Sequence, residues 1–446
     1  MVTLEVRGSA MRIVSAIAVS GLLLTAASAW AQTTVESDVA AFRRLRAEGV
    51  AAANADDLAG ATRLLAEADA RIPNHPGLML MRARLAVAAG QPEEAMTQMN
   101  RYAGAGLVVN LAGDRALSTL AGHPDFDALA AVIDANRAPI GADRLAEVAR
   151  IDGSVIVESL IRDETRGRWL VSQVRGRTIV ALADDGTVTD FLVLGTEPDI
   201  GGVLGMALDT EAGVLWAATS PLAPAVQGLG TDAVLPAPGL LKIDLTTGAV
   251  LARLAPPSGP LERGLGDIVR APDGAVHVAD SVTGELLVLR PGALALEVLL
   301  PAGTLGSPQG MVVTPDGTAL IVADYSSGLW RVDRATGAAT RLTAPAIDSL
   351  IGVDGLTTDG RFLYGFQNGV APQRVLKFEL DAGWRSILNV EVMAANLPLI
   401  DEPTTGLVRN GELVFVSRSQ WSDFDGDGAQ TTVAPAPAVI ARLPLD

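Results

Sequence analysis

The spacing of apolar residues changes once along the chain, near residue 150. Residues 36–137 carry apolar positions at helical spacing in Ala-rich segments, and polar or Pro-containing breakers separate these segments at 54–57, 73–76 and 90–92. Beyond that point, short apolar runs alternate with Asp-Gly and Thr-Gly dipeptides, which favour tight hairpins because glycine accepts a positive φ. The pattern predicts a helical segment followed by a region of many short strands.

The strand region repeats one unit, which residues 266–281 and 310–325 show best. Each reads as a strand, a Pro-Asp-Gly turn, a second strand that ends in Val-Ala-Asp, and then two further strands. Six unit starts, most of them a Gly followed by Leu or Met, lie about 43 to 62 residues apart, which is typical of propeller blades. Four-stranded blades that close radially leave few sheet edges exposed. We therefore expect an all-β six-bladed propeller; the alternative is a seventh blade within residues 221–239, a segment that otherwise forms an insertion.

Equivalent residues of the blades should surround the propeller axis. The residue before the Gly of each unit falls at the same place in its blade, so these residues should form a ring. The ring positions are Glu158, Leu204, Gly266, Gln309, Asp354 and Thr405. Only two of them carry carboxylates. Closure of the propeller should pair its two ends, with residues 155–156 beside residues 439–440.

The helical segment shows a period of its own. Residues 57–61 align with residues 91–95 at a shift of 34 residues, and the small Ala61 and Ala95 fall where close helix packing is needed. The stretch resembles two tetratricopeptide repeats. Such repeats either present a groove to a protein partner or act as a helical cap. Residues 138–150 read as a linker, which leaves residues 151–446 for the propeller.

Residues 1–31 match a secretory signal. Arg7 and Arg12 supply a positive n-region, residues 13–27 form a short apolar stretch, and residues 29–31 (Ala-Trp-Ala) form an A-x-A cleavage site. Met11 is an alternative start. An uncleaved anchor is the other interpretation, although the apolar run is short for a membrane span. We expect an exported protein, periplasmic or secreted, with no membrane span after cleavage.

The composition of the chain excludes several kinds of binding and catalysis. The net charge is -17, which argues against a nucleic-acid surface because phosphate binding needs clustered Lys and Arg. The chain has no cysteine, which excludes disulfides, thiolate catalysis and Cys-ligated zinc, and its three His are dispersed. An acidic chain is compatible with divalent cations or basic partners.

The blade region resembles the SMP-30/gluconolactonase-like propeller family, with NHL-repeat propellers as relatives. The resemblance spans about residues 150–445 and rests on the Pro-Asp-Gly turns, the Val-Ala-Asp strand ends, residues 352–356 (Gly-Val-Asp-Gly-Leu) and the start of the first blade. It implies one divalent metal on the axis, often calcium. Glu158 and Asp354 match the family's two carboxylate ligands, and Gln309 stands where the family has a ligating Asn.

The chain departs from the family pattern at two places. Gln309 keeps a carbonyl oxygen suited to a hard cation, but its side chain is one methylene longer than that of Asn. The third blade has Gly266-Asp267 where the family has Asn-Asp, so only Asp267 remains. If the site is catalytic, the resemblance implies metal-assisted hydrolysis of a lactone-like molecule, with Asp267 or Asp354 handling the proton of the attacking water.

A second acidic cluster lies near the end of the chain. Asp423, Asp425 and Asp427 alternate with other residues and precede Gly428, which matches the first half of a calcium loop. Position twelve is Ala434 instead of Glu, so an EF-hand is not expected. The cluster is either a calcium-stabilised loop or an acidic turn.

Two functions therefore remain open. One is an exported, metal-dependent hydrolase of the lactonase type that acts on a small molecule. The other is a non-catalytic binding protein that uses the tetratricopeptide-like helices and the propeller face to recognise a protein partner. A quinone-dependent redox propeller is not favoured, because the ring lacks the basic and His residues that such enzymes need.

Overall fold

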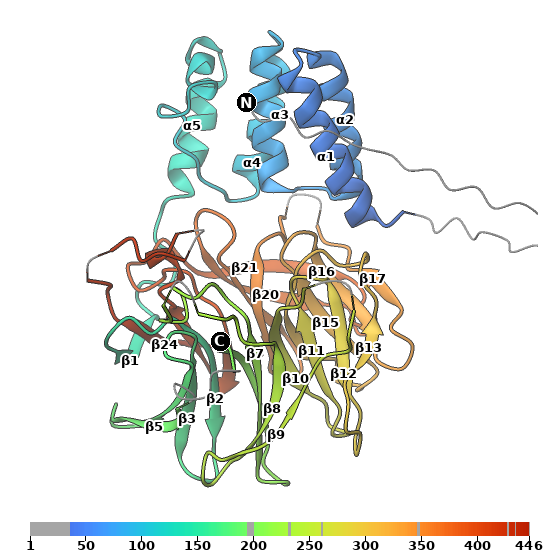
Figure 1. The fold of residues 1–446 in the computed structure, drawn as a ribbon. Helices are drawn as coiled ribbons and strands as arrows, with labels where there is room; N and C mark the ends of the chain where they lie inside the picture. The colour runs from blue at the N-terminus through green and yellow to red at the C-terminus, as the bar shows by residue number, and fades with distance from the viewer. Residues whose placement is uncertain are drawn as a thin grey trace, which may run out of the picture. The chain divides into compact units, whose positions relative to one another are not determined.

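The computed structural model describes residues 36–193, 200–230, 233–259, 262–345, 348–425, 428–432 and 434–445 (Figure 1). The predicted signal, residues 1–31, lies outside this range. Among the described helices, none is both long and apolar enough to cross a lipid bilayer.

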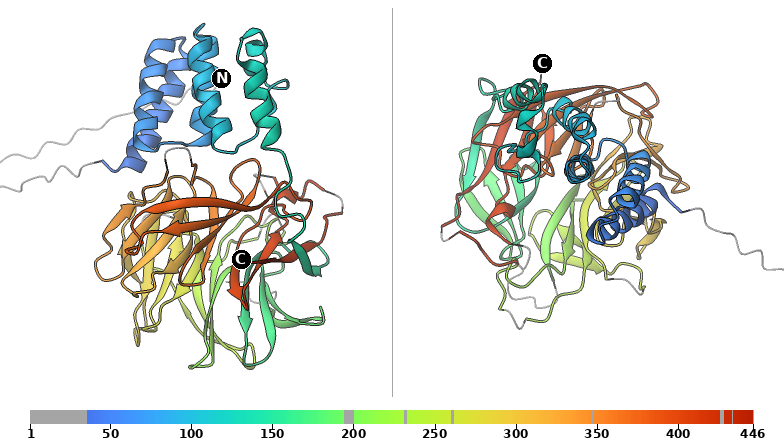
Figure 2. Two further views of the ribbon diagram at one scale, coloured as in Figure 1. Left: turned by 180° about the vertical axis from the view of Figure 1, so that it is seen from behind. Right: turned by 90° about the horizontal axis from the view of Figure 1, so that it is seen from above.

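Five α-helices and one 3₁₀ turn precede the strands in the described part of the chain. They are α1 (Asp38–Asn54), α2 (Leu58–Arg71), α3 (Pro76–Ala88), α4 (Pro92–Gly104), η1 (Leu117–Gly122) and α5 (Phe126–Ala135). Caps in the sequence set where helices begin: Ser37 accepts a hydrogen bond from Ala40 N, and Asp57 accepts one from Gly60 N. Helix α1 packs on α2 and α3 on α4. Figure 2 shows the helices following one another in a row when seen from above.

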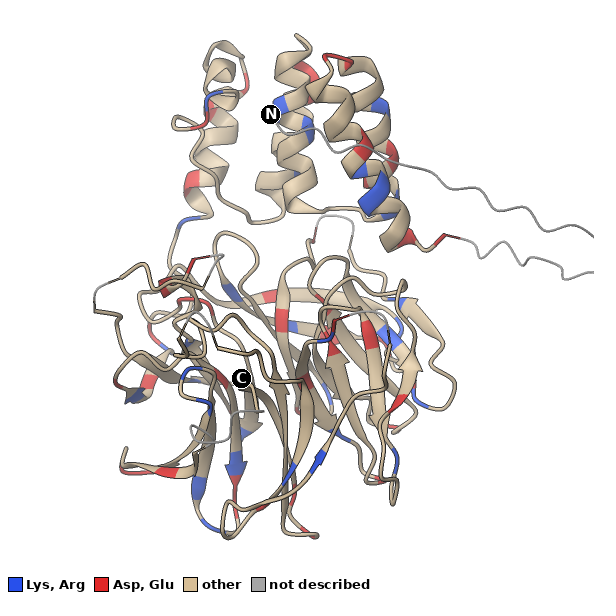
Figure 3. Cartoon of the chain, viewed as in Figure 1, with Lys and Arg blue, Asp and Glu red and all other residues tan. Residues whose placement is uncertain are grey.

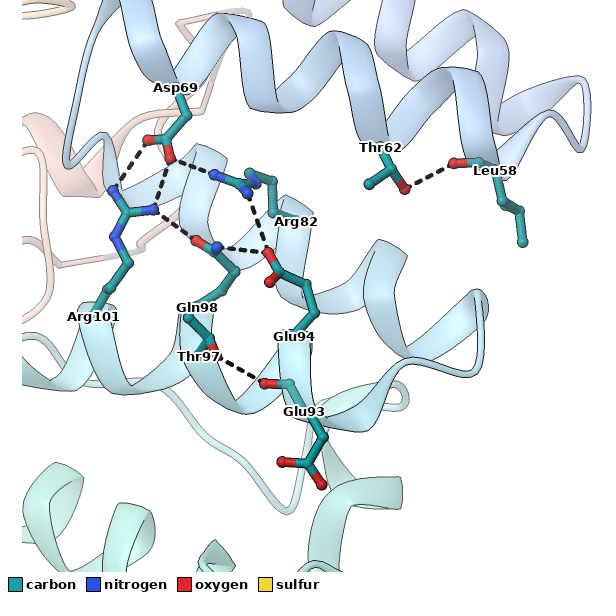
Figure 4. A network of polar contacts seen from close by, with 9 residues as sticks. All are labelled: Leu58, Thr62, Asp69, Arg82, Glu93, Glu94, Thr97, Gln98 and Arg101. Carbon is teal, nitrogen blue, oxygen red and sulfur yellow. Dashed lines mark hydrogen bonds and ion pairs between the residues drawn. The ribbon is translucent and has the colours of Figure 1, made fainter.

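A network of polar contacts joins α2, α3 and α4 (Figure 4). Asp69 accepts hydrogen bonds from Arg82 and from Arg101, the latter at 2.7 Å. Arg82 also donates to Glu94 at 3.1 Å, and Gln98 bridges Glu94 and Arg101. The Asp69 and Arg82 side chains are only 11% and 16% exposed, so solvent screens these pairs weakly. The network therefore ties α4 to both preceding helices.

Six four-stranded antiparallel sheets follow in the described residues. Blade 1 is β2 (Val157–Asp163), β3 (Arg168–Gln173), β4 (Thr178–Ala183) and β5 (Val188–Val193); blade 2 is β6 (Gly202–Asp209), β7 (Val214–Ser220), β8 (Gly239–Asp244) and β9 (Val250–Leu254). Blade 3 is β10 (Leu265–Arg270), β11 (Val276–Asp280), β12 (Glu285–Leu289) and β13 (Glu297–Leu300); blade 4 is β14 (Pro308–Val313), β15 (Ala319–Asp324), β16 (Gly328–Asp333) and β17 (Ala339–Arg341). Blade 5 is β18 (Val353–Thr358), β19 (Leu363–Gln367), β20 (Arg374–Leu380) and β21 (Ile387–Ala395); blade 6 is β22 (Gly406–Arg409), β23 (Glu412–Arg418), β24 (Ala438–Pro444) and β1 (Ala146–Ile151), with a short η2 (Trp421–Asp423) after β23.

The innermost strands close a ring. Strands β2, β6, β10, β14, β18 and β22 contact one another in that order, and β22 contacts β2. Glycine permits this close approach: a Cβ at Gly310 would lie 2.5 Å from Leu356 N, and one at Gly355 would lie 2.0 Å from Thr404 O. Both glycines belong to the repeated unit starts. The prediction of a six-bladed propeller preceded by helices is confirmed, and residues 221–230 and 233–238 contain no strand.

The closing strand differs from the expected one. Strand β1 lies largely within residues 138–150, which had been assigned to a linker, and Ala149 of β1 pairs with β24. The expected pairing of residues 155–156 with 439–440 is wrong. The backbone N–H groups of residues 155 and 156 bind Gln420 Oε1 instead, at 2.9 and 3.1 Å. Gly153, with a φ of 92°, turns the chain before them, so these apolar residues lead into β2 and not into the closing strand.

The helical segment and the propeller share part of their apolar core. Phe42 and Leu45 of α1 belong to the same buried cluster as Leu305 and Trp330 of the propeller. Arg43 donates to Gly306 O at 2.9 Å. Residues 37–446 accordingly form one compact unit.

Candidate axial site

A cavity of about 430 Å³ lies where the innermost strands begin. Five of the six predicted ring positions line it: Glu158, Leu204, Gly266, Gln309 and Asp354. Asp267 lines it as well, whereas Thr405 does not belong to the lining. We call this space the axial cavity. The structure thus brings together the four side chains that the sequence singled out for chemistry, Glu158, Asp267, Gln309 and Asp354.

A β-bulge in each of the first five inner strands explains this convergence. The pairing register shifts between Val157 and Leu160 in β2, and equivalent shifts occur in β6, β10, β14 and β18. A bulge bends its strand and re-aims the side chains at that point. The ring position of each of these five blades lies inside the bulge, and therefore the equivalent side chains of successive blades meet at one cavity.

Hydrogen bonds orient the acidic and amide groups. Glu158 Oε2 accepts a hydrogen bond from Trp421 Nε1 at 2.5 Å, and Asp354 Oδ2 accepts one from Asn368 Nδ2 at 2.7 Å. Asn368 Oδ1 and Glu402 Oε2 are buried and have no hydrogen-bond partner among the described residues. Two oxygen acceptors beside the acidic groups are therefore left for a ligand, water or ion.

The two residues that depart from the family pattern, Gln309 and Gly266, lie beside each other. Gln309 Nε2 donates to Ser307 Oγ at 3.2 Å, which bends this longer side chain back on its own strand. A Cβ at Gly266 would lie 3.8 Å from Gln309 Oε1. The glutamine oxygen therefore lies beside the position where the missing third-blade side chain would begin.

The axial cavity concentrates negative charge. Burial raises the pKa of Glu158 to about 8, and the charges of Asp267 and Glu402 add to this. Burial raises the pKa of Asp267 to about 6, and burial together with Glu158 and Asp267 raises the pKa of Asp354 well above its ordinary value. No Lys, Arg or His belongs to the described lining of this cavity, although acidic and basic segments are interspersed over the rest of the propeller (Figure 3). Buried carboxylates without a cationic partner favour a bound cation or a shared proton.

The donor atoms fit a hard divalent cation in type. Glu158, Asp354, Gln309 and Asn368 offer only oxygen donors, and the unpartnered Asn368 Oδ1 lies in the same lining. In the described residues no three Asp, Glu, His or Cys side chains are grouped closely enough to hold a metal by themselves. Two carboxylates with amide oxygens would therefore have to complete the coordination.

Of seven further lining residues that were missed from the sequence, four bear on the chemistry: Tyr325, Asn368, Glu402 and Trp421. Two of them had a signal, because Tyr325 and Asn368 each directly follow the second strand of a blade, as Ser281 does in blade 3. Burial and the charge of Asp354 raise the pKa of Tyr325 to about 12, so its hydroxyl stays protonated. Glu402 and Trp421 come from irregular loops of blade 6, where no repeat marks them.

The other acidic residues have structural partners. Asp324 accepts hydrogen bonds from the N–H groups of Gly306 and Ser307 and so holds the loop before β14. In the late cluster, Asp423 accepts from Thr432 Oγ1 at 2.9 Å and Asp425 accepts from Ala429 N at 2.8 Å. Asp427 lies outside the described residues, so a calcium loop there stays a prediction.

A buried arginine connects the helical segment to the residue beside Asn368. Arg374 donates to Ala105 O, after α4, at 3.0 Å and to Gln367 Oε1 at 2.9 Å. Gln367 in turn donates to Ile351 O at 2.7 Å. Burial lowers the pKa of Arg374 to about 10. Arg374 thus fixes the end of β19, from which Asn368 reaches Asp354.

Together the blades, the ring closure and the axial cavity define a six-bladed β-propeller with an N-terminal helical segment. No protein-family model and no curated protein matches the chain. Solved structures similar to it include a gluconolactonase from Xanthomonas campestris (17% identity, 69% of this chain and 91% of that one, TM-score 0.47) and the calcium-binding protein regucalcin from Agrobacterium tumefaciens (17%, 68% and 94%, 0.46). Another is the PQQ-bound aldose sugar dehydrogenase of Streptomyces coelicolor (14%, 69% and 99%, 0.47). The fold assignment rests on the strand pairing described above.

Proposed function

We propose that this is an exported propeller protein that binds one divalent cation, calcium, in the axial cavity and hydrolyses a lactone-like small molecule there. Glu158, Gln309 and Asp354 would hold the cation, joined by Asn368. The observation that carries the proposal is the meeting of Glu158, Asp267 and Asp354 in one cavity whose described lining has no cationic side chain. A cavity of about 430 Å³ is of the size that small-molecule sites have.

When bound, the cation supplies a Lewis acid that polarises a carbonyl and stabilises the developing oxyanion. Residues of the chain would take up the proton of the attacking water. Asp267 has its pKa raised to about 6, close to neutral, which suits a general base for water. Tyr325 remains a phenol at neutral pH and is a hydrogen-bond donor for a substrate oxygen. Trp421 holds Glu158 and Asn368 holds Asp354, so neither carboxylate has to be ordered during the reaction.

Non-catalytic binding is the second candidate, and one observation favours it. Arg263, which precedes Gly266 and Asp267 closely in the sequence, donates instead to Asp280 at 3.0 Å and to Glu285. The described lining of the axial cavity therefore has no guanidinium to orient a substrate. Partner recognition would then fall to the propeller face and the helices.

A calcium titration of thermal stability tests the cation site. After treatment with a chelator, the native protein should gain stability on adding calcium, by about 2.7 kcal/mol at 100-fold excess over Kd. Asp354→Asn should lose this response, while Glu67→Gln, which alters an exposed pair on α2, should keep it. A native protein that does not respond to calcium would rule the site out. A panel of lactones assayed with and without calcium then separates the hydrolase from the binding protein.

A further inference from the structure

A second cavity, of about 700 Å³, lies between the helical segment, blade 4 and the connection that leads from blade 4 to blade 5. Its charged lining residues are Asp38 and Arg101 from the helical segment and Arg341 and Asp348 from the propeller. Leu329, Leu342, Leu350 and Ile351 supply apolar walls. We call this space the junction cavity. It shares no described lining residue with the axial cavity.

Two of the four charged groups already have partners. Arg101 donates to Asp69 at 2.7 Å and to Asn74 Oδ1 at 3.3 Å. Asp38 accepts a hydrogen bond from Arg71 at 3.2 Å. These two side chains therefore need no ligand to balance their charge.

The other two groups have opposite charges and no such partner. Neither the Arg341 guanidinium nor the Asp348 carboxylate makes a hydrogen bond or ion pair within the described residues, and both are partly buried. Burial lowers the pKa of Arg341 and raises that of Asp348. The nearby charge of Asp38 acts in the opposite direction on Arg341, and that of Arg374 does so on Asp348. The backbone positions are held: Asp348 O accepts from Asn74 Nδ2 at 3.2 Å, and Arg341 pairs with Trp330 in the sheet. Both charges are therefore left to water or to a ligand of opposite charge, and a ligand that displaces the water must meet both.

We propose that the junction cavity binds a small zwitterion with an apolar body, of the size of an apolar dipeptide. Its carboxylate would pair with Arg341, whose planar guanidinium matches a carboxylate geometrically. Its ammonium group would pair with Asp348, and its apolar side chains would lie against the leucine and isoleucine walls. A simple anion or a simple cation would satisfy only one of the two unpaired groups. The proposal does not depend on the function of the axial cavity.

The test uses the full chain and three probes of one shape. Leucyl-leucine carries both charges, N-acetyl-leucyl-leucine lacks the ammonium group, and leucyl-leucine amide lacks the carboxylate. Calorimetric titration should give saturable binding of leucyl-leucine at or below about 1 mM, and about tenfold weaker binding of each modified probe, as expected for one lost charged contact. Absence of binding at about 10 mM, or equal affinity for all three probes, would overturn the proposal.

Two variants test which side chain binds each charged group of the ligand. Arg341→Gln should abolish the preference for leucyl-leucine over its amide but keep the preference over the acetylated probe. Asp348→Asn should do the reverse. Arg331→Gln, on the neighbouring strand β16 of the same blade, is the matched control and should bind all three probes as the native protein does. If both cavity variants keep both preferences, Arg341 and Asp348 are not the contacts and the proposal fails.

Discussion

The axial cavity and the junction cavity contain charged groups in opposite arrangements. In the axial cavity, Glu158, Asp267 and Asp354 share one sign. Asp267 raises the pKa of Glu158, both raise the pKa of Asp354, and the described lining supplies no counter-charge. In the junction cavity two acidic and two basic groups balance, and those without partners have opposite signs. A cation or bound protons would therefore neutralise the first cavity, whereas a ligand that carries both charges would match the second.

The largest expected effect concerns the wall of the axial cavity. Gly355→Ala should destabilise the protein by about 3 kcal/mol or more, because the new Cβ would lie 2.0 Å from Thr404 O and would push two blades apart. Gly266→Ala is the matched control. Its Cβ would meet nothing closer than Gln309 Oε1 at 3.8 Å, so its unfolding free energy should stay within about 0.5 kcal/mol of native. Denaturant unfolding of both variants compares them, and equal losses would contradict the close-approach explanation.

The next effect is a pH dependence of stability to which the axial carboxylates contribute near neutral pH. Glu158, Asp267 and Asp354 have pKa values raised in the folded state, so the folded protein binds protons more tightly than the unfolded chain. Stability is therefore fully present below their unfolded pKa values and is lost as the pH rises toward 8. Without calcium, the free energy of unfolding should fall by about 1 to 2 kcal/mol between about pH 7 and pH 8. At lower pH His75 and His277, whose pKa values burial lowers to about 4, act in the opposite direction.

Calcium and Asp267→Asn should both flatten this profile, since each removes part of the like-charge repulsion. Asp348→Asn in the junction cavity should leave its shape nearly unchanged. A profile that rises from pH 7 to pH 8 in chelator would show that the axial carboxylates do not repel one another in the folded state.

A smaller effect connects the helical segment to the axial cavity. Arg374→Gln leaves Ala105 O without its buried donor and releases Gln367, which should cost about 2 kcal/mol of stability. Because Asn368 follows Gln367 directly, calcium affinity should also weaken by about tenfold. Arg374→Lys should recover part of the lost stability and part of the lost calcium affinity. A loss of stability with unchanged calcium affinity would limit Arg374 to a structural role.

The smallest effect is expected in the junction cavity without ligand. Arg341→Gln should change the free energy of unfolding by no more than about 0.5 kcal/mol, because this guanidinium has no partner to lose among the described residues. A loss of 2 kcal/mol or more would mean that the arginine already has a partner in solution, and the contrast between the two cavities would disappear.

Local sequence patterns predicted most of the fold and about half of the residues that line the axial cavity. Repeated unit starts, Pro-Asp-Gly turns and Val-Ala-Asp strand ends are local signals, so they predicted six blades and the ring positions. Closure was misplaced because β1 and residues 155–156 are both short apolar runs, and only pairing with β24 distinguishes them. Glu402 and Trp421 lie in loops without periodicity, so no pattern could assign them to the cavity.

The sequence by itself determined the blade repeat, because a glycine where neighbouring inner strands approach is a requirement on each unit separately. It also determined that Glu158 and Asp354 occupy equivalent places. Only the tertiary structure decided that Asn368, Tyr325 and Trp421 face the same cavity, that Arg374 joins the helices to that site, and that Arg341 and Asp348 lie in a cavity without partners among the described residues. Those relations depend on contacts between residues far apart in the chain, and local pattern carries no information about such contacts.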